Sequence, residues 1–577
     1  MNIFSVLTLL GGLALFLYGM HLMGDALKKL AGGKLESILA RLTDTRFKGF
    51  LLGLFVTATI QSSSAVIVML VGFVNSGIMQ LSQTTAIIMG ANIGTTVTAW
   101  LLSLSGISGS TVFLRFLKPE TFTPILSVIA IIFILFSKNE KRKNIATVLM
   151  GFSILMFGMK AMSSIDDTTA FSNAFMAFKN PFAGILIGTL ITAVIQSSSA
   201  SVGILQALSL TTPIPFSIAI PIILGQNLGA AITPLLSSIG GNKHAKRVAV
   251  SGLYIKIIGV VVVGVLFYIC DAIFSFSFMS ENANVFTIAV VHTAFNVFST
   301  VILLPFCSQI EKLACMTVGG NHVENDVFSV LDDRFLSIPG FAVTKCKELV
   351  FDMAEKTRQC VLKSVDMISG FDKNVLKEIS DSEKEIDKYE DKTGAYLIKI
   401  SSQQLDNEDN SLVSRLLHAV GDLERISDHA VNLSRSAEEM NTKNIVFSTS
   451  AQNDIGVIKN AVREIVNLTV DSFVNEDIEK ARLVEPLSRL IDNLRYKIKD
   501  NHIQRLRDGK CTAELGFVLS DMLSDFERIS GHCSNVAVTL LDAESNAETH
   551  KYLRKLRKEE DEYSKNYEIF EEKYRLE

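Results

Sequence analysis

The feature that most constrains this chain is a polar block that occurs twice inside apolar sequence. "TATIQSSSAVIVML" covers residues 57–70, and "TAVIQSSSASVGIL" covers residues 192–205. The flanks are apolar enough for a lipid bilayer, yet the centre carries one amide and three hydroxyl side chains. At that depth, irregular polar backbone survives only where protein or a water-filled cavity surrounds it. The doubled block therefore predicts a polytopic membrane domain that encloses a polar site.

The two blocks belong to a longer internal repeat. Residues 53–101 align with residues 188–236 at a constant offset of 135 without gaps, and 18 of the 49 positions are identical. The register continues through "GANIGTT" and "GQNLGAA", well beyond the first block. Because a chance match of one pentapeptide would not hold this register, we interpret the repeat as a duplicated structural unit.

Charge divides the 577 residues into two parts. Residues 1–320 hold 19 Lys and Arg and 10 Asp and Glu, whereas the remainder holds 36 and 49. We therefore expect a membrane domain over 1–310, a linker over 311–340 and a soluble domain over 341–577. The acidic second part argues against nucleic-acid binding. Seven cysteines without a CxxC pair predict reduced thiols.

Seven apolar runs are predicted to span the bilayer as helices. The spans are 3–23, 80–104, 122–137, 145–163, 214–238, 248–270 and 285–308, and the polar blocks form re-entrant hairpins over 47–75 and 181–209. The first run lacks a basic leader and a small-residue cleavage site, so we expect a retained span rather than a signal peptide. The 122–137 run is short for a span.

Loop charge sets the expected orientation. With the N-terminus outside, the inside loops 24–48, 138–144 and 239–247 carry 13 Lys and Arg, and the outside loops 105–121, 164–181 and 271–284 carry 3. Positive residues collect in the cytoplasm, so the acidic domain is predicted to be cytoplasmic. Three spans separate the hairpins, which makes the repeats, about 3–137 and 145–308, inverted; losing the short 122–137 span would break this inversion.

Inverted repeats with broken helices place a binding site near the bilayer midplane. A hairpin tip there exposes helix N-termini, whose unpaired N–H groups suit an anion. Serine hydroxyls both donate and accept, so one block can serve an oxyanion and a cation such as Na⁺. The alternative is that these side chains join packed helices. The candidate site residues are Gln61, Ser62, Ser63, Ser64, Gln196, Ser197, Ser198 and Ser199, with Thr57, Thr192, Asn92 and Asn227 nearby.

Three further polar residues lie in predicted spans. His292 and Asn296 are one turn apart in "HTAFN", and both binding and interhelical packing are open for them. Lys256 lies within the 248–270 span, where snorkelling, pairing and a functional role are the alternatives. We find no GxxxxGK[ST] motif and no nucleophile–base constellation. Neither an ATP-driven pump nor an enzyme is indicated.

The paired QSSS blocks, "GANIGTT", "GQNLGAA" and "HTAFN" together resemble the type II sodium-dependent inorganic phosphate cotransporters, over about residues 3–308. The resemblance implies Na⁺-coupled phosphate movement, with the QSSS hairpins lining the phosphate and sodium site. The matching positions are Gln61 to Ser64 and Gln196 to Ser199. How these positions divide between phosphate and Na⁺ is left open.

The soluble part also repeats. "GDLERISDHAVNL" (421–433) matches "SDFERISGHCSNV" (524–536), and "EIDKYEDK" (385–392) echoes "LIDNLRYK" (490–497). Two three-helix units would form a helical bundle. The first copy resembles the PhoU-type phosphate-regulatory domain, over about residues 340–570.

In that family, ExxxD carboxylates on facing helices can hold metal. The resemblance assigns this role to Glu424, Asp428, Asp387 and Glu390, and a solvated carboxylate face is the alternative. In the second copy Gly531 replaces the aspartate and Arg495 replaces a glutamate, which places a second metal site in doubt.

The sequence thus predicts an all-α chain that acts as a sodium-dependent phosphate symporter in the plasma (inner) membrane, with a PhoU-like regulatory bundle. Its partners are inorganic phosphate, Na⁺ as coupling ion and the lipid bilayer, and an apolar bundle face is compatible with a homodimer. An exporter of the same family and a membrane-anchored phosphate sensor are the alternatives. The residues fix neither the direction of flux nor the sodium count.

Overall fold

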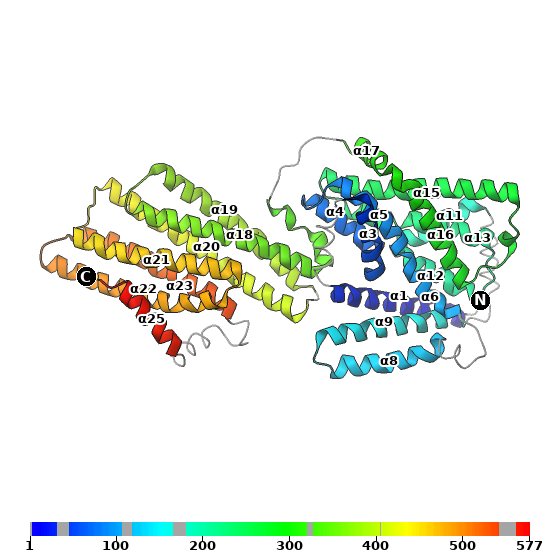
Figure 1. Cartoon of the computed structure of the whole chain (residues 1–577), viewed down its shortest axis with the longest axis horizontal. Coiled ribbons are helices and arrows are strands. Elements are labelled where there is room, and N and C mark those ends of the chain that lie inside the picture. The colour runs from blue at the N-terminus through cyan, green and yellow to red at the C-terminus, as the bar shows by residue number, and fades with distance from the viewer. Residues whose placement is uncertain are drawn as a thin grey trace. The chain divides into compact units, whose positions relative to one another are not determined.

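The structure, a computed structural model, describes residues 3–31, 45–106, 118–164, 180–319, 327–403, 405–541 and 561–576. The predicted loops 24–48, 105–121 and 164–181 therefore lie partly outside the described residues. The described part is nearly all helical, and its β structure is limited to an isolated bridge, which confirms the all-α fold class. The helices form two compact units, Met1–Phe341 and Ala342–Glu577 (Figure 1).

The first unit contains the repeated sequence. Its helices are α1 (Ile3–Ala31), α3 (Arg46–Ile60), α4 (Ser63–Asn75), α5 (Leu81–Gly94), α6 (Thr96–Ser103), α8 (Pro119–Phe136), α9 (Glu140–Met162), α11 (Pro181–Ile195), α12 (Ser198–Ser209), α13 (Phe216–Gly229), α14 (Ile232–Ser237), α15 (Lys243–Phe274), α16 (Val285–Leu303) and α17 (Cys307–Thr317). Short 3₁₀ turns are η1 (Leu104–Gly106), η2 (Ser277–Ser280), η3 (Leu304–Phe306), η4 (Val327–Val330) and η5 (Asp333–Ser337).

Six helical stretches among the described residues are long and apolar enough to cross a bilayer. They are Phe4–Leu30, Leu81–Gly106, Glu140–Met162, Phe216–Ser237, Lys243–Phe274 and Val285–Thr317. These six correspond to six of the seven predicted spans, and the chain is a multi-pass membrane protein. The seventh, 122–137, forms an apolar helix over Thr121–Phe136, which is shorter than the roughly 20 residues that a span needs.

Each half contains a hairpin. The evidence is that two of its helices run in the same direction, so the helix between them must turn the chain back. In the first half Gly90 lies against residues 50–54 of α3, and Gly94 lies against residues 54–58, so α3 and α5 run in the same direction. The intervening helix α4 must therefore return the chain. The same contacts recur at an offset of 135, where Gly225 lies against Ile185 in α11. A Cβ at Gly90 or at Gly225 would overlap the facing carbonyl oxygen, so both close packings require glycine.

Two buried apolar clusters hold the halves together. One joins α12, α13, α15 and α16, with Ile223 and Ile288 fully buried. The other joins α1, α9 and α12 around the fully buried Phe16. Helix α12 takes part in both clusters, so the helix that follows the second polar block is anchored on two sides.

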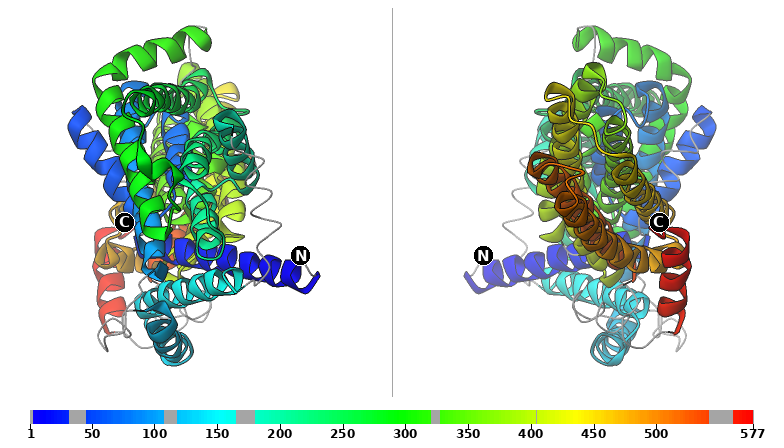
Figure 2. Two further views of the ribbon diagram at one scale, coloured as in Figure 1. Left: turned by 90° about the vertical axis from the view of Figure 1, so that its right-hand side faces the viewer. Right: turned by 90° about the vertical axis from the view of Figure 1, so that its left-hand side faces the viewer.

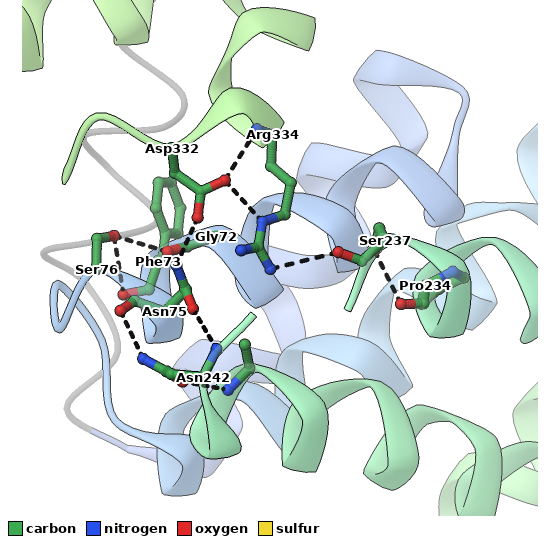
Figure 3. Close-up of polar contacts among 10 residues, drawn as sticks. Gly72, Phe73, Asn75, Ser76, Pro234, Ser237, Asn242, Asp332 and Arg334 are labelled. Carbon is green, nitrogen blue, oxygen red and sulfur yellow. Dashed lines mark hydrogen bonds and ion pairs between the residues drawn. The ribbon is translucent and has the colours of Figure 1, made fainter. Parts of the chain in front are cut away.

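The end of the expected linker, 311–340, is packed against the first unit. Its end packs on α4: Asn75 Nδ2 donates to Asp332 Oδ2 at 2.7 Å, and Arg334 Nε donates to Asp332 Oδ1 at 2.7 Å (Figure 3). The ring of Phe335 is fully buried, with its centroid 5.6 Å from that of Phe73. These residues are an integral part of the first unit rather than a free tether.

The second unit is a helical bundle. Its helices are α18 (Pro339–Met367), α19 (Lys373–Ser401), α20 (Asn407–Thr442), α21 (Thr449–Asn475), α22 (Ile478–Arg507), α23 (Ala513–Leu541) and α25 (Asp561–Lys573). The long helices lie side by side along the unit (Figures 1 and 2). Each shows a buried apolar face, as its sequence periodicity predicts.

The two copies of the repeated bundle sequence contact each other reciprocally. His429 Nδ1 lies 2.8 Å from Asp525 Oδ1, and His532 Nδ1 lies 2.8 Å from Asp422 Oδ1. The two imidazole rings face each other at a centroid distance of 6.0 Å. Because each pair maps onto the other at the repeat offset of 103, α20 and α23 occupy equivalent positions in the two halves of the bundle.

Candidate functional site

The two polar blocks form the same broken-helix turn. Helix α3 ends at Ile60, and Gln61 takes the left-handed conformation with φ 62° and ψ 22°. Helix α11 ends in the same way at Gln196, with φ 60° and ψ 19°. A non-glycine residue in this region costs about 1 kcal/mol, so it persists only where the surroundings impose it. The predicted hairpin tips therefore lie at these turns.

The second and third residues of each block begin a new helix. Ser62 and Ser197 are N-caps, and their hydroxyls accept the N–H groups of Ala65 and Ala200 at 3.2 Å. The first backbone N–H groups of α4 and α12 then belong to the next two serines, and these groups have no intrahelical acceptor. Those serines are all buried: Ser63, Ser64, Ser198 and Ser199.

The chemistry of each turn suits an oxyanion on one side and a cation on the other. The N-terminus of α4 carries a partial positive charge from the helix dipole and presents free N–H donors. The C-terminus of α3, directly before the turn, presents carbonyl oxygens and the opposite partial charge. A single break in a helix thus offers both kinds of ligand group within a few residues.

Thr57 and Thr192 lie one turn before the break. Each is fully buried, and each hydroxyl oxygen lacks a hydrogen-bond partner among the described residues. Each also contacts the glycine two residues after the predicted asparagine, Gly94 in the first half and Gly229 in the second. The structure therefore brings each threonine together with the Asn-Gly motif of its own half.

The two asparagines differ. Asn92 is buried, and its Oδ1 has no hydrogen-bond partner in the described part of the chain. Asn227 is also buried, and its Nδ2 donates to the carbonyl of Ile223 at 3.0 Å, within its own helix. A buried oxygen without a partner among the described residues is costly, so the Oδ1 of Asn92 is available to accept a bond or to coordinate a cation.

The two glutamines also differ. Gln61 is half-buried: its Oε1 accepts from Thr98 Oγ1 at 2.6 Å, and its Nε2 donates to Ala58 O at 2.5 Å. The side chain of Gln196 is exposed, and its contact with Thr233 is a 3.4 Å bond to the backbone carbonyl. The first turn is therefore tied to its neighbouring helix through the side chain of its glutamine, whereas the second is tied through the backbone carbonyl of its glutamine.

Two buried glutamines that the sequence reasoning missed bond to neighbouring helices, and one of them, Gln206, joins the two halves. The amide of Gln206 in α12 donates to Ala99 O at 3.0 Å and to Val285 O at 2.7 Å. Gln226 donates to Ser201 O at 2.9 Å, and its Oε1 is unpartnered. Gln226 was visible inside the quoted "GQNLGAA", whereas Gln206 carries no motif signal. No hydrogen bond joins the two QSSS blocks within the described ranges, so a single shared site stays a prediction.

His292 and Asn296 lie in the buried centre of α16. Asn296 Nδ2 donates to the carbonyl of His292 at 2.8 Å, which uses one end of its amide within the helix. Neither ring nitrogen of His292 has a partner in the part of the chain that the structure describes. The side chain of Lys256 in α15 is also buried.

A carboxylate group lies in the second unit. Oxygens of Glu383, Asp387 and Asp428 lie within 4.8 Å of one another, and each residue is half-buried. Two of these were predicted as metal ligands, while the predicted Glu424 and Glu390 are not members of the group. Glu383 was missed, although it forms a further ExxxD pair with Asp387.

Electrostatics in this group and at the neighbouring Glu424 favour protonation or a bound cation. Burial and the neighbouring Asp428 raise the pKa of Glu424 to about 7. Burial and Asp428 also raise the pKa of Asp387. In the second half of the bundle Arg495 donates to Asp492 at 3.0 Å, and Gly531 carries no ligand. Among the described residues, the donor set that fits a hard divalent cation is the one in the first half.

Comparisons with known proteins place both units. Residues 15–164 and 170–285 match the Na+/Pi-cotransporter family, and residues 350–437 and 456–540 match the PhoU domain. The chain is 22% identical over 556 residues to a protein of Escherichia coli (strain K12) named "Putative inorganic phosphate export protein YjbB", covering 93% of this chain and 98% of that one.

Two other relatives match one unit each. The sodium-dependent phosphate transport protein 2A of Rattus norvegicus is 33% identical over 117 residues, which is 20% of this chain and 18% of that protein. The phosphate-specific transport system accessory protein PhoU homolog 1 of Thermotoga maritima is 25% identical over 139 residues, covering 24% of this chain and 59% of that protein. No solved structure gives a significant match.

Proposed function

Because the chain belongs to the Na+/Pi-cotransporter family and carries a PhoU domain, we propose that it moves inorganic phosphate together with Na⁺ across the plasma (inner) membrane. Members of this family are transporters rather than enzymes. The observation that carries the proposal is the pair of broken-helix turns, whose backbone angles agree within a few degrees at Gln61 and Gln196.

Phosphate fits the N-terminal side of each turn. The free N–H groups at Ser63 and Ser198, with the hydroxyls of the same buried serines, offer donors to phosphate oxygens. These donors are neutral groups. Burying them at midplane depth costs less free energy than burying arginine or lysine side chains at the same positions.

Na⁺ fits the opposite side of each turn. Hard cations take oxygen ligands, and the buried oxygens of Thr57, Thr192 and Asn92 lack other partners. Carbonyl oxygens at the ends of α3 and α11 lie beside them in sequence. Coupling follows if the anion and the cation share one site, since each offsets the other's charge.

An inverted arrangement of the two hairpins is supported by where each hairpin ends relative to α15. The first hairpin ends at Asn75, which bonds with Asn242 directly before α15 (2.8 and 2.7 Å). After the second hairpin, Ile214 O accepts from Ala283 N at 2.8 Å, beyond the far end of α15. Helix α15 spans 32 residues, about 48 Å, so these ends lie on opposite faces. Such a pair supports alternating access, and the loop charges support an outside N-terminus and a cytoplasmic bundle.

Transport is tested with purified full-length protein in liposomes. We expect phosphate uptake that depends on an inward Na⁺ gradient and is absent with K⁺ in place of Na⁺. For the serine variants Ser63→Ala and Ser198→Ala in this assay, the matched control is Ser209→Ala, whose hydroxyl bonds within its own helix. Phosphate movement in neither direction under either sign of Na⁺ gradient would contradict the proposal.

Export is a second candidate, because the relative that covers nearly the whole chain is named as an export protein. The same liposomes separate the two directions when they are loaded with phosphate and diluted into buffers with or without Na⁺. Efflux that is faster than influx at matched gradients would favour export.

The bundle is proposed to regulate transport, and the packed end of the linker supports this role. Helix α18 begins at Pro339 within the first unit, where the ring of Phe341 contacts Phe73 of α4 at 5.0 Å. Removing residues 342–577 should leave transport in place and abolish its dependence on phosphate status. If transport persists but cells lose phosphate-responsive signalling alone, the sensor alternative gains.

The carboxylates are proposed to hold a divalent cation. Asp387, Asp428 and Glu383 would supply oxygen ligands, and the cation would relieve their mutual repulsion. Isothermal titration of the full-length protein with Mn²⁺ or Mg²⁺ tests this, with Asp428→Asn as the variant expected to lose binding.

A further inference from the structure

Lys256 is a cation without a partner inside the membrane unit. Its side chain is 5% exposed, and neither a hydrogen bond nor an ion pair joins its ammonium to another described residue. Among the described lysines and arginines of the first unit, it alone is buried. An unpaired charge at this depth is expensive, so such a residue either pairs with a ligand or has a function.

The register of α15 against α4 places Lys256 beside the first QSSS turn. Asn242, directly before α15, bonds with Asn75 at the end of α4. Ten residues later, a Cβ at Gly252 would lie 4.0 Å from Ile67 Cγ2. The two helices therefore run antiparallel in contact. One further turn along α15, about 6 Å, reaches Lys256, while α4 recedes to Ser63 and Ser64.

Lys256 also shares the face that contacts α4. Residues four apart lie on the same side of a helix, so Gly252 and Lys256 present one face. The end of α4 at that level is its N-terminal turn, with free N–H donors and buried serines. A helix N-terminus carries only about half an elementary charge. A phosphate that brings one or two negative charges needs a further cation.

The second turn has no equivalent cation. Lys256 is assigned to the first turn by its register on α4, and every other described lysine and arginine of the first unit is less buried. The two turns therefore share a backbone conformation, but only the first is assigned a buried cation. Because the asymmetry falls on one turn, it distinguishes the roles that the two QSSS blocks can take.

We propose that Lys256 neutralises the phosphate anion at the first QSSS turn, so that the charge of phosphate is held mainly by the first block. This inference rests on the proposed phosphate transport and deepens it by dividing the two blocks. Na⁺ keeps the hydroxyl, amide and carbonyl oxygens on the opposite side of the turns, among them those of Thr57, Asn92 and Thr192.

The test compares Lys256→Met with Lys246→Met in the full-length protein in liposomes. Lys246 lies on the same helix and is exposed, so it receives the same chemical change without burial. We expect Lys256→Met to raise the KM for phosphate tenfold or more and the KM for Na⁺ less than threefold. Lys246→Met should change neither, and Lys256→Arg, which keeps the charge, should stay within about threefold of wild type.

A thermal-unfolding measurement separates this role from a structural one. Without phosphate, Lys256→Met should be at least as stable as wild type, since it removes an unpaired buried charge. Phosphate should raise the Tm of wild type but not of the variant. A Lys256→Met protein that is folded and has the wild-type phosphate KM overturns the inference while transport stands.

Two more outcomes are decisive. If Lys256→Met does not fold, Lys256→Gln replaces it, and failure of both neutral variants to fold contradicts an unpaired cation. Wild-type protein that moves no phosphate overturns both this inference and the proposed function.

Discussion

The two QSSS turns share one backbone and differ in what surrounds it. Gln61 and Gln196 have nearly the same left-handed angles, and Ser62 and Ser197 make the same cap. Around the first turn, however, Thr98 holds the glutamine, and we infer from the register of α15 on α4 that Lys256 lies level with the serines. The comparison teaches that two copies of one sequence can keep the same backbone geometry while the side chains around them differ, which allows the two turns to take different roles.

The bundle repeats this lesson. Its two copies keep the reciprocal pairs of His429 with Asp525 and of His532 with Asp422. Among the described residues the carboxylate group occurs in the first copy, and Gly531 stands in the second copy where the first has Asp428. The His–Asp contacts between the two copies are therefore the same in both directions, whereas the carboxylates proposed to bind a cation differ between the copies.

The largest expected effect tests the shared backbone. Gly90→Ala and Gly225→Ala should both prevent folding, each at a cost of at least about 3 kcal/mol, because the new Cβ would overlap a backbone carbonyl. Gly24→Ala is the control, since nothing lies within 4 Å of a Cβ there. Expression and gel filtration measure the outcome. A folded variant on one side only would show that the halves are packed differently.

The next effect tests the division of roles. Ser63→Ala should raise the phosphate KM about tenfold, a loss of about 1.4 kcal/mol, and Ser198→Ala should raise it less. The reason is that a charged partner is expected beside the first turn alone. Uptake kinetics in liposomes measure both. Equal losses in both variants would contradict the asymmetry.

An effect of similar size tests the tie at the first turn. Gln61→Leu should destabilise the protein by about 1–2 kcal/mol, because it removes bonds to Thr98 and Ala58. Gln196→Leu should change stability by less than about 0.5 kcal/mol, since this side chain is exposed. Thermal unfolding without ligands compares the two. A larger loss at Gln196 would reverse the comparison.

The smallest effect concerns the bundle. The pKa of Glu424 in the folded protein is about 7, above its ordinary value of 4.5. The folded state thus favours the protonated form of Glu424, so the contribution of this group to stability is fully present below pH 4.5 and is lost as pH rises through 7. Without metal, Glu424→Gln should stabilise the protein by about 1 kcal/mol at pH 8, after allowance for solvent screening, and by nothing at pH 4. The Tm at the two pH values measures this, and a loss of stability at pH 8 would contradict it.

Much of the fold could be predicted from the sequence. A gapless repeat with QSSS blocks specified two hairpins, and the breaks occur at the polar residues because serine caps a helix well. The apolar runs predicted seven spans; six of them form helices long enough to cross a bilayer, while 122–137 forms a shorter helix. The packed end of the linker could not be foreseen, since Asp332 and Phe335 carry no pattern and their partners lie far away in the chain.

The candidate site was predicted in part. Motif residues were recognisable, but the unpartnered oxygens of Thr57 and Asn92 depend on tertiary neighbours. Lys256 looked ambiguous in the sequence, because burial and the lack of a partner are properties of the packed unit. Glu383 was hidden for a different reason: its ExxxD spacing is visible, but its approach to Asp428 depends on how α19 packs on α20.

The central claim is that the two turns together carry Na⁺-coupled phosphate transport. Its most direct test is radiolabelled phosphate flux in liposomes, with and without a Na⁺ gradient, for wild type and the double variant Ser63→Ala/Ser198→Ala. The account predicts Na⁺-dependent flux in wild type and its loss in a folded double variant. Flux that does not depend on Na⁺, or that survives in the double variant, would contradict it.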